Sequence, residues 1–275
     1  MNKIAQLVSV FALGLTVSMM AHGHRAWIKP SATVLSGEDA WVTFDAAVSN
    51  DIFHVNHVPL DYQRLTAIGP DGKSVELHNA ATGKYRSTFD VNLSQSGTYI
   101  VFYASSGLTA RWETEGGERR FWPPRGVAPT PEGFEKEVPK KAKNLQISQS
   151  SHRIETFVTA GSPSDTVLKP TKVGLEMVPV THPNDLFAGE TADFIFLMDG
   201  KPAVGAKVTA IPGGMRYRNE QAAIEVVTDK KGKASITWPD AGMYWLNAEY
   251  SDDKGKKPAK QRRGAYVATL EVLPE

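Results

Sequence analysis

The feature that most limits the fold of this chain is its succession of short β-strand patterns, each closed by turn-forming residues. Five segments are rich in β-branched and aromatic residues, namely 41–44, 99–103, 154–158, 194–197 and 244–246. Turns rich in glycine, proline, lysine and aspartate separate such segments, as at 69–72, 199–202 and 229–232. This composition favours strands bounded by turns. We therefore expect an all-β protein built from β-sandwiches.

One short segment departs from the strand pattern. Thr130 can cap a helix, Pro131 suits its first turn, and Pro139 ends it. The sequence therefore predicts a short helix close to 130–137, and almost nothing else reads as a long amphipathic helix.

A weak internal repeat indicates two sandwiches in tandem. The pattern before the strand at 41–44 recurs before 194–197, and the pattern at 96–100 recurs at 241–245. We expect an N-terminal sandwich over 22–168 and a C-terminal sandwich over 169–275, the latter immunoglobulin-like or prealbumin-like. Each repeat places a tyrosine two residues after a turn glycine, which predicts that Tyr99 and Tyr244 tie sandwich corners to nearby backbone.

The stretch 107–143 is charged, rich in proline and poorly periodic. Such composition suits a long surface excursion inserted in the first sandwich. Trp112 and Trp122 within it have two readings. They either pin the excursion to the sandwich or form a platform for a sugar, a peptide or a partner protein.

The N-terminus has the pattern of an export signal. Lys3 is followed by an uncharged apolar run from 4 to 20, and Ala21 offers a small residue for cleavage. Cleavage after Ser18 is the alternative. We expect residues 1–21 to be removed and the remainder to reside in the periplasm.

Composition of the remaining chain narrows its chemistry. Without Lys3 the chain holds 30 basic and 30 acidic residues, which gives no electrostatic case for nucleic acid. The absence of cysteine excludes disulfides, thiol catalysis and thiolate metal sites. Any metal must therefore be bound by nitrogen and oxygen.

Cleavage after Ala21 would create a metal-chelating terminus. The mature chain would begin at His22 and carry His24 as its third residue. A terminal amine, backbone amides and imidazole offer nitrogen donors in a plane, which suits Cu(II) and Ni(II). Alternatively, the amine and ring of His22 hold one ion as a brace, with a distant histidine completing the site. The remaining alternative is a pair of exposed histidines on a frayed terminus.

A second histidine pair lies in the segment 53–59. On a regular strand His54 and His57 would face opposite sides, but Asn56 and Pro59 indicate a loop in which both rings can converge. We expect a shared metal site formed by His22, His24, His54 and His57, with Ni, Co or Cu as the ion and Zn as a further option.

Several short motifs recur in one known family. They are His24, 27–28, 49–54, 69–72, 157–159, 174–185, 200–208, 241–246 and 269–274. With them the chain resembles a bacterial family of unknown function whose members are often labelled periplasmic components of cobalt or nickel uptake systems. The resemblance spans nearly the whole mature chain. It implies a periplasmic protein that acts in transition-metal uptake, delivery or homeostasis beside a membrane transporter or an outer-membrane receptor.

Two other functions compete with this one. A histidine at the mature terminus followed by a β-sandwich also resembles copper-dependent oxidative enzymes of the histidine-brace type. The third reading is a glycan- or protein-binding envelope module that uses Trp112 and Trp122. No nucleophile elbow, zinc-protease helix or phosphate loop is present in the sequence, so we expect no enzymatic activity.

Overall fold

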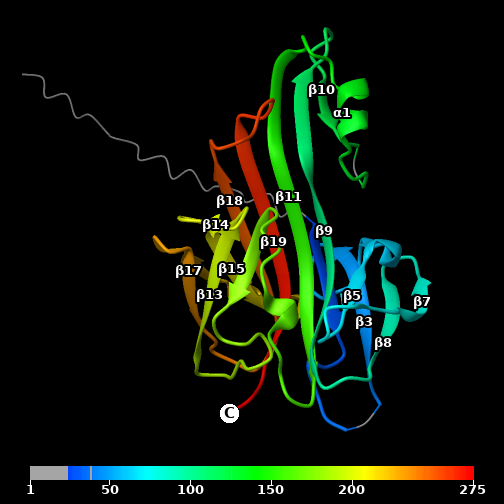
Figure 1. The fold of residues 1–275 in the computed structure, drawn as a ribbon, viewed down its shortest axis with the longest axis vertical. Helices are drawn as coiled ribbons and strands as arrows, with labels where there is room; N and C mark the ends of the chain where they lie inside the picture. The colour runs from blue at the N-terminus through cyan, green and yellow to red at the C-terminus, as the bar shows by residue number, and fades with distance from the viewer. Residues whose placement is uncertain (1–23, 38, 125) are drawn as a thin grey trace, which may run out of the picture.

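The computed structural model describes residues 24–37, 39–124 and 126–275. It confirms the all-β class, with strands arranged in three sheets (Figure 1). The five-stranded sheet contains β1 (Arg25–Pro30), β3 (Ala40–Ser49), β4 (Val58–Pro59), β7 (His78–Thr82) and β8 (Ser87–Leu93). The four-stranded sheet contains β12 (Leu175–Pro179), β13 (Thr191–Met198), β14 (Lys201–Pro202) and β17 (Lys233–Thr237).

The ten-stranded sheet draws strands from both halves of the chain. It contains β2 (Val34–Leu35), β5 (Thr66–Ile68), β6 (Ser74–Val75), β9 (Gly97–Glu113), β10 (Arg119–Trp122), β11 (Lys143–Ala160), β15 (Lys207–Pro212), β16 (Ile224–Val227), β18 (Gly242–Asp252) and β19 (Gln261–Val272). The described helical segments are η1 (Tyr62–Arg64), α1 (Pro131–Glu137), η2 (Thr166–Leu168) and η3 (Met215–Tyr217). All five strand segments expected from sequence lie within these strands.

The ten-stranded sheet supplies one wall to each of two hydrophobic cores. Tyr99 and Val101 of β9 pack in the core of the five-stranded sheet, whereas Ile100 packs in the core of the four-stranded sheet. On β18, Trp245 and Leu246 divide between the two cores in the same way. Because neighbouring side chains of a strand point to opposite faces, one sheet completes both sandwiches.

The two halves meet along a parallel strand pair. Ser148–Thr156 of β11 pairs with Gln261–Thr269 of β19, while β18 and β19 form an antiparallel pair on the far side. Strands from both halves of the chain therefore lie in one sheet, which the repeat in the sequence did not predict. The boundary between 168 and 169 stays a prediction.

The corner tyrosines behave as predicted. The Tyr99 hydroxyl donates to the Gln95 carbonyl at 3.0 Å and accepts from the Gln95 amide at 2.8 Å. The Tyr244 hydroxyl donates to the Asp240 carbonyl at 2.8 Å. The turn glycines that precede them, Gly97 and Gly242, have almost equal φ angles of 142° and 141°. The internal repeat thus corresponds to the same corner built twice.

The excursion at 107–143 has more regular structure than its sequence predicts. It continues β9 and β11 beyond the sandwiches, adds β10, and carries α1 against one face, so that a ribbon projects from the body (Figure 1). Trp122 is buried at the centre of a small core and meets Phe134 of α1 edge-on, with ring centroids 5.5 Å apart. The helix begins as predicted, because Thr130 accepts from the Gly133 amide at 3.1 Å.

A polar network joins the start of the second half of the chain, at residues 182–184, to strands β9 and β11 of the first half. Nδ1 of His182 accepts from the Asn184 amide at 3.1 Å, so Nε2 carries the proton and donates to the Thr98 hydroxyl at 2.9 Å. Thr98 and Thr159 contact each other at 3.0 Å, and Thr159 donates to Asn184 at 2.8 Å. His182 and Asn184 therefore fasten the start of the second half to β9 and β11.

This network predicts that the protein loses stability in mild acid. Burial lowers the pKa of His182, against weaker opposing effects of Ser164 and Asp185. A histidine whose folded-state pKa is depressed contributes stability above its unfolded pKa of about 6.5, and this stability is lost as pH falls through the folded value. We expect His182→Gln to flatten the fall in thermal midpoint between about pH 7.5 and pH 5. Burial also lowers the pKa of His152, so part of the slope should persist; an unchanged slope would contradict the assignment.

Candidate functional site

The start of β1 and the start of β4 bring two of the expected histidines together. Arg25 pairs with Ser49 on one side of β3, and Val58 pairs with Val48 on the other. His24 directly precedes β1 and His57 directly precedes β4. Between them the chain from 50 to 57 passes over the end of β3, so residues 33 positions apart become neighbours.

The rings of His24 and His57 are stacked. Their centroids are 3.7 Å apart and their planes differ by 7°. His24 is exposed and His57 is half-buried, so the pair is accessible from solvent. An imidazole lone pair lies in the plane of its ring, so two parallel rings cannot both direct a nitrogen at one ion. Joint coordination therefore requires one ring to turn.

The loop between these strands is held by its own polar side chains. Asn56 accepts from the Asn50 amide at 2.8 Å and donates to Asp51 at 3.1 Å. Ser49 donates to the Asp51 carbonyl at 2.6 Å and accepts from the indole nitrogen of Trp27 at 2.7 Å. Trp27 is buried in the core. Through Ser49 it therefore anchors the loop at 50–57 to the core.

His54 takes a different partner from His57. Nη1 of Arg216, in η3, lies 2.7 Å from Nε2 of His54. A guanidinium only donates hydrogen bonds, so Nε2 of His54 is the acceptor in this contact. Sequence analysis did not find Arg216, because 162 positions separate it from His54 and no local pattern marks it. Arg216 therefore occupies one of the two ring nitrogens through which His54 could bind a metal ion.

The expected four-histidine site lies only partly within the described residues. His22 is outside them, and the described ranges hold no group of three or more His, Asp or Glu side chains placed to bind one ion. The structure thus brings His24 and His57 together and directs His54 to Arg216. Two neutral imidazoles fit a borderline transition metal, but they need further donors.

The ribbon offers a second candidate site. A cavity of about 270 Å³ lies near its tip and includes Trp112, Phe121 and Arg111 in its lining. Phe121 is 65% exposed, whereas Trp122 is 5% exposed. Trp122 is part of the small ribbon core, and Trp112 packs against that core while also lining the cavity. Both tryptophans thus pin the ribbon, and a ligand role for Trp112 stays a prediction.

Comparison with solved structures finds distant resemblances among all-β domains. The D0-D1 domain of intimin is 11% identical and the match covers 90% of this chain and 97% of that chain, with a TM-score of 0.23. The chicken CNTN1 FN1-FN3 domains are 8% identical, and the match covers 92% of this chain and 99% of that chain with a TM-score of 0.24. Escherichia coli alpha-2-macroglobulin activated by porcine elastase is 11% identical, and the match covers 92% of this chain and 20% of that chain with a TM-score of 0.24. No curated protein matches the chain.

Two further findings bear on the class of protein. Among the described helices, none has the length and apolar character needed to cross a membrane. Residues 21–252 match a family described as a domain of unknown function, DUF4198. This range begins just before His22 and includes the loop at 50–57, the ribbon and most of both sandwiches. Because the match covers most of the chain, this protein belongs to the DUF4198 family.

Proposed function

We propose that this protein is a periplasmic accessory protein that binds a transition-metal ion at the edge formed by His24 and the loop at 50–57. The observation that supports the proposal best is the stacked contact of His24 with His57 at 3.7 Å. Two imidazoles from separate segments meet on an accessible edge, and the loop that carries one of them is hydrogen-bonded into place. This is a partly assembled nitrogen site.

The missing donors follow from the covalent chain. Export cleavage after Ala21 would leave the amine and ring of His22 two residues from His24. Two residues span at most about 7 Å, so the new terminus is tethered within reach of the ring pair. Three imidazoles and an amine suit Cu(II) or Ni(II) best, with Co(II) and Zn(II) as further candidates. Release to a membrane transporter or outer-membrane receptor would complete uptake or delivery.

The test compares the affinity for Ni(II) and for Cu(II) of three proteins by competition with a chromogenic chelator. They are the protein that begins at His22, the same protein with one alanine added before His22, and His57→Ala. The extension turns the amine into an amide and the substitution removes a ring, so we expect each to weaken binding by about tenfold or more. His78→Ala is the matched control, because His78 lies on β7 and contacts Trp41 instead.

Arg216→Ala separates the role of His54 from that of the other rings. If His54 joins the metal site, removal of Arg216 frees its Nε2 and raises the affinity, and His54→Ala abolishes that gain. Equal affinity of the extended, His57→Ala and starting proteins would disprove the proposed site. Circular dichroism of each variant verifies that the fold is retained.

A further inference from the structure

A second cavity lies at the base of the ribbon, far along the chain from the histidines. Its volume is about 300 Å³, at the lower end of the range of roughly 300–1,000 Å³ for small-molecule sites. The strands β9 and β11 form one side, and the turns that follow residues 172 and 198 form the other. The loop between β18 and β19 closes its rim with Lys256 and Lys257.

The lining combines an apolar part with a cationic rim. Leu108, Val173 and Met198 contribute the apolar part, and Val173 is 57% exposed. Apolar side chains that line a concave surface are what small-molecule sites offer to the apolar part of a ligand. Opposite this part stand the two exposed lysines of the rim.

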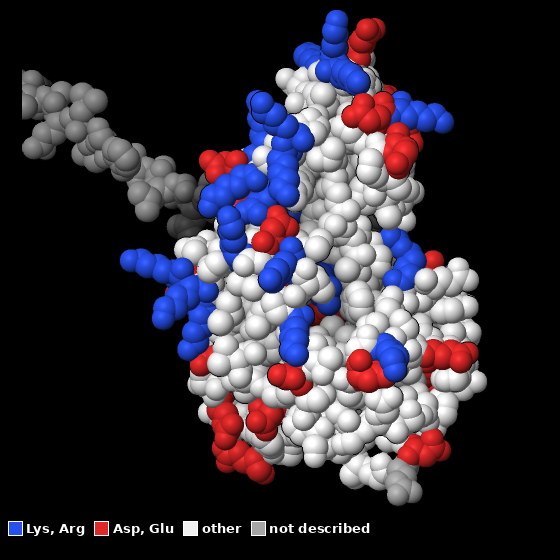
Figure 2. Space-filling model, in the orientation of Figure 1, with Lys and Arg blue, Asp and Glu red and all other residues white. Residues whose placement is uncertain are grey.

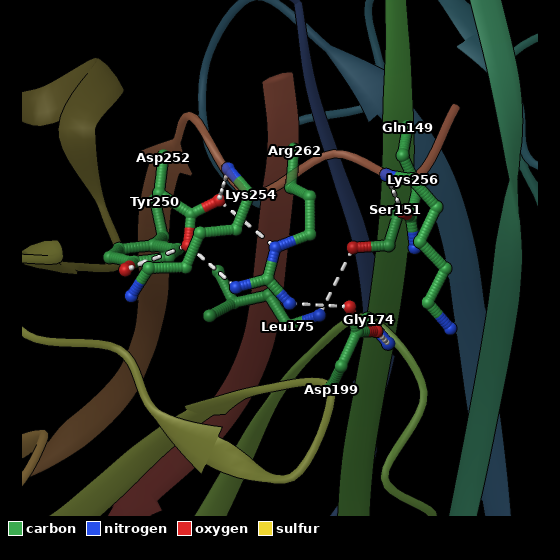
Figure 3. A network of polar contacts seen from close by, with 10 residues as sticks. All are labelled: Gln149, Ser151, Gly174, Leu175, Asp199, Tyr250, Asp252, Lys254, Lys256 and Arg262. Atoms are coloured by element: carbon green, nitrogen blue, oxygen red, sulfur yellow. Dashed lines mark hydrogen bonds and ion pairs between the residues drawn. The ribbon is translucent and has the colours of Figure 1, made fainter. Parts of the chain in front are cut away.

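The acidic residue in this cavity does not neutralise the lysines. Asp199 lies 2.7 Å from Nη1 of Arg262 and accepts from the Gly174 amide at 2.9 Å. Arg262 also pairs with Asp252 at 2.6 Å (Figure 3). Over residues 24–37, 39–124 and 126–275, neither Lys256 nor Lys257 has an ion-pair partner. The rim is therefore net positive.

The lysine loop is fastened to the ribbon and does not hang free. The Lys256 amide donates to Gln149 of β11 at 3.5 Å, and the Lys260 amide donates to the Ile147 carbonyl at 3.3 Å. Figure 3 shows Lys256 beside Gln149 and Ser151 on β11. Figure 2 shows Lys and Arg side chains gathered along one side of the ribbon, with acidic side chains both at the ribbon tip and at the opposite end of the body. Two lysines without an ion-pair partner favour an anion at the rim.

We infer that this cavity binds a small amphiphile with an anionic head and a short apolar tail. The head, a carboxylate or a phosphate, lies between the ammonium groups of Lys256 and Lys257. The tail covers Val173 and Leu108 at the base of the ribbon. A free inorganic anion would contact the lysines and leave Val173 exposed. A neutral apolar molecule would cover Val173 and leave the lysines without a counter-charge. An anionic amphiphile matches both parts of the cavity.

Isothermal titration of the whole mature protein tests this inference. The probes are dodecanoate, dodecyl phosphate, dodecyltrimethylammonium and inorganic phosphate, each below any micelle-forming concentration. We expect saturable 1:1 binding of the two anionic amphiphiles only. Lys256→Gln combined with Lys257→Gln should weaken that binding by about tenfold or more, and raised salt should weaken it as well.

Two further variants make the result decisive. Lys230→Gln with Lys231→Gln removes the same charge from an exposed turn outside the cavity and should leave binding unchanged. Val173→Trp fills the mouth at an exposed position, so it should abolish binding while the thermal midpoint is kept. Equal binding of the cationic amphiphile, equal binding of inorganic phosphate, or full binding by the Lys256/Lys257 variant would overturn the inference. Binding of the protein to phosphatidylglycerol vesicles without binding of the monomeric amphiphiles would also overturn it.

Discussion

Replacing Trp27 by alanine should lower the free energy of unfolding by about 3–5 kcal/mol, the usual range for truncating a buried tryptophan. Trp27 is 1% exposed and meets Phe53 edge-on, with centroids 5.6 Å apart. The surrounding strands can close only part of the cavity that alanine would leave. The lost indole donor also leaves Ser49 with its bond to the Asp51 carbonyl only. Urea denaturation at neutral pH measures the effect.

Trp41→Ala is the matched control, because Trp41 is 46% exposed and should change stability by no more than about 0.5 kcal/mol. Trp27→Phe keeps most of the apolar volume and loses the indole donor and a small part of the ring volume, so we expect a loss of about 1–2 kcal/mol, smaller than for alanine. If the loop at 50–57 depends on Trp27 as described, Trp27→Phe should also weaken metal binding. A loss below about 1 kcal/mol for Trp27→Ala would show that the site lacks the packing described.

Replacing Glu155 by alanine should cost about 3–5 kcal/mol, because it leaves a buried charge without its partner. Glu155 is 2% exposed, pairs with Arg153 and accepts from the Tyr266 hydroxyl at 2.6 Å. Burial raises the pKa of Glu155, although Arg153 opposes that shift. Arg153 itself is mostly buried and lies over the Phe102 ring at 4.6 Å.

Two comparisons test this reading of the buried pair. In the exposed pair Arg120–Glu118 the side chains are 59% and 67% exposed, so Glu118→Ala should cost less than about 1 kcal/mol. The triple variant Arg153→Met, Glu155→Leu, Tyr266→Phe removes the bonded trio together, while the nearby buried Glu176 keeps its bonds to Thr171 and the Lys172 amide. The triple variant should unfold within about 1 kcal/mol of the starting protein or be more stable. The desolvation argument would be refuted if the triple variant lost several kcal/mol of unfolding free energy while Glu155→Ala left it unchanged.

Local patterns predicted much of the fold. The strand segments, the cap at Thr130 and the corner tyrosines could be found because each depends on residues a few positions apart. The shared sheet could not be found, because the parallel pairing of β11 with β19 joins residues more than a hundred positions apart. The ribbon was also missed. Leu108, Ala110 and Trp112 do alternate with polar residues in β9, and Leu145 and Ile147 do so in β11, but each run is short and a charged, proline-rich stretch separates the two, so the pairing of the strands has no local signal.

The candidate site was predictable to a smaller extent. The histidine pairs could be singled out as metal-ligand types, and the loop around Asn56 could be expected. That His57 would stack on His24 while His54 turns to Arg216 depends on tertiary pairing of β1, β3 and β4. The cavity at the ribbon base had no sequence signal, because its lining comes from five separate segments.

The two long strands β9 and β11 connect the ribbon to both cores. They contain 17 and 18 residues, so each runs roughly 55–60 Å at about 3.3 Å per residue. The same strands contribute side chains to both cores and continue into the ribbon. A change in the direction of the ribbon relative to the body must therefore bend these two strands or break the hydrogen bonds between them.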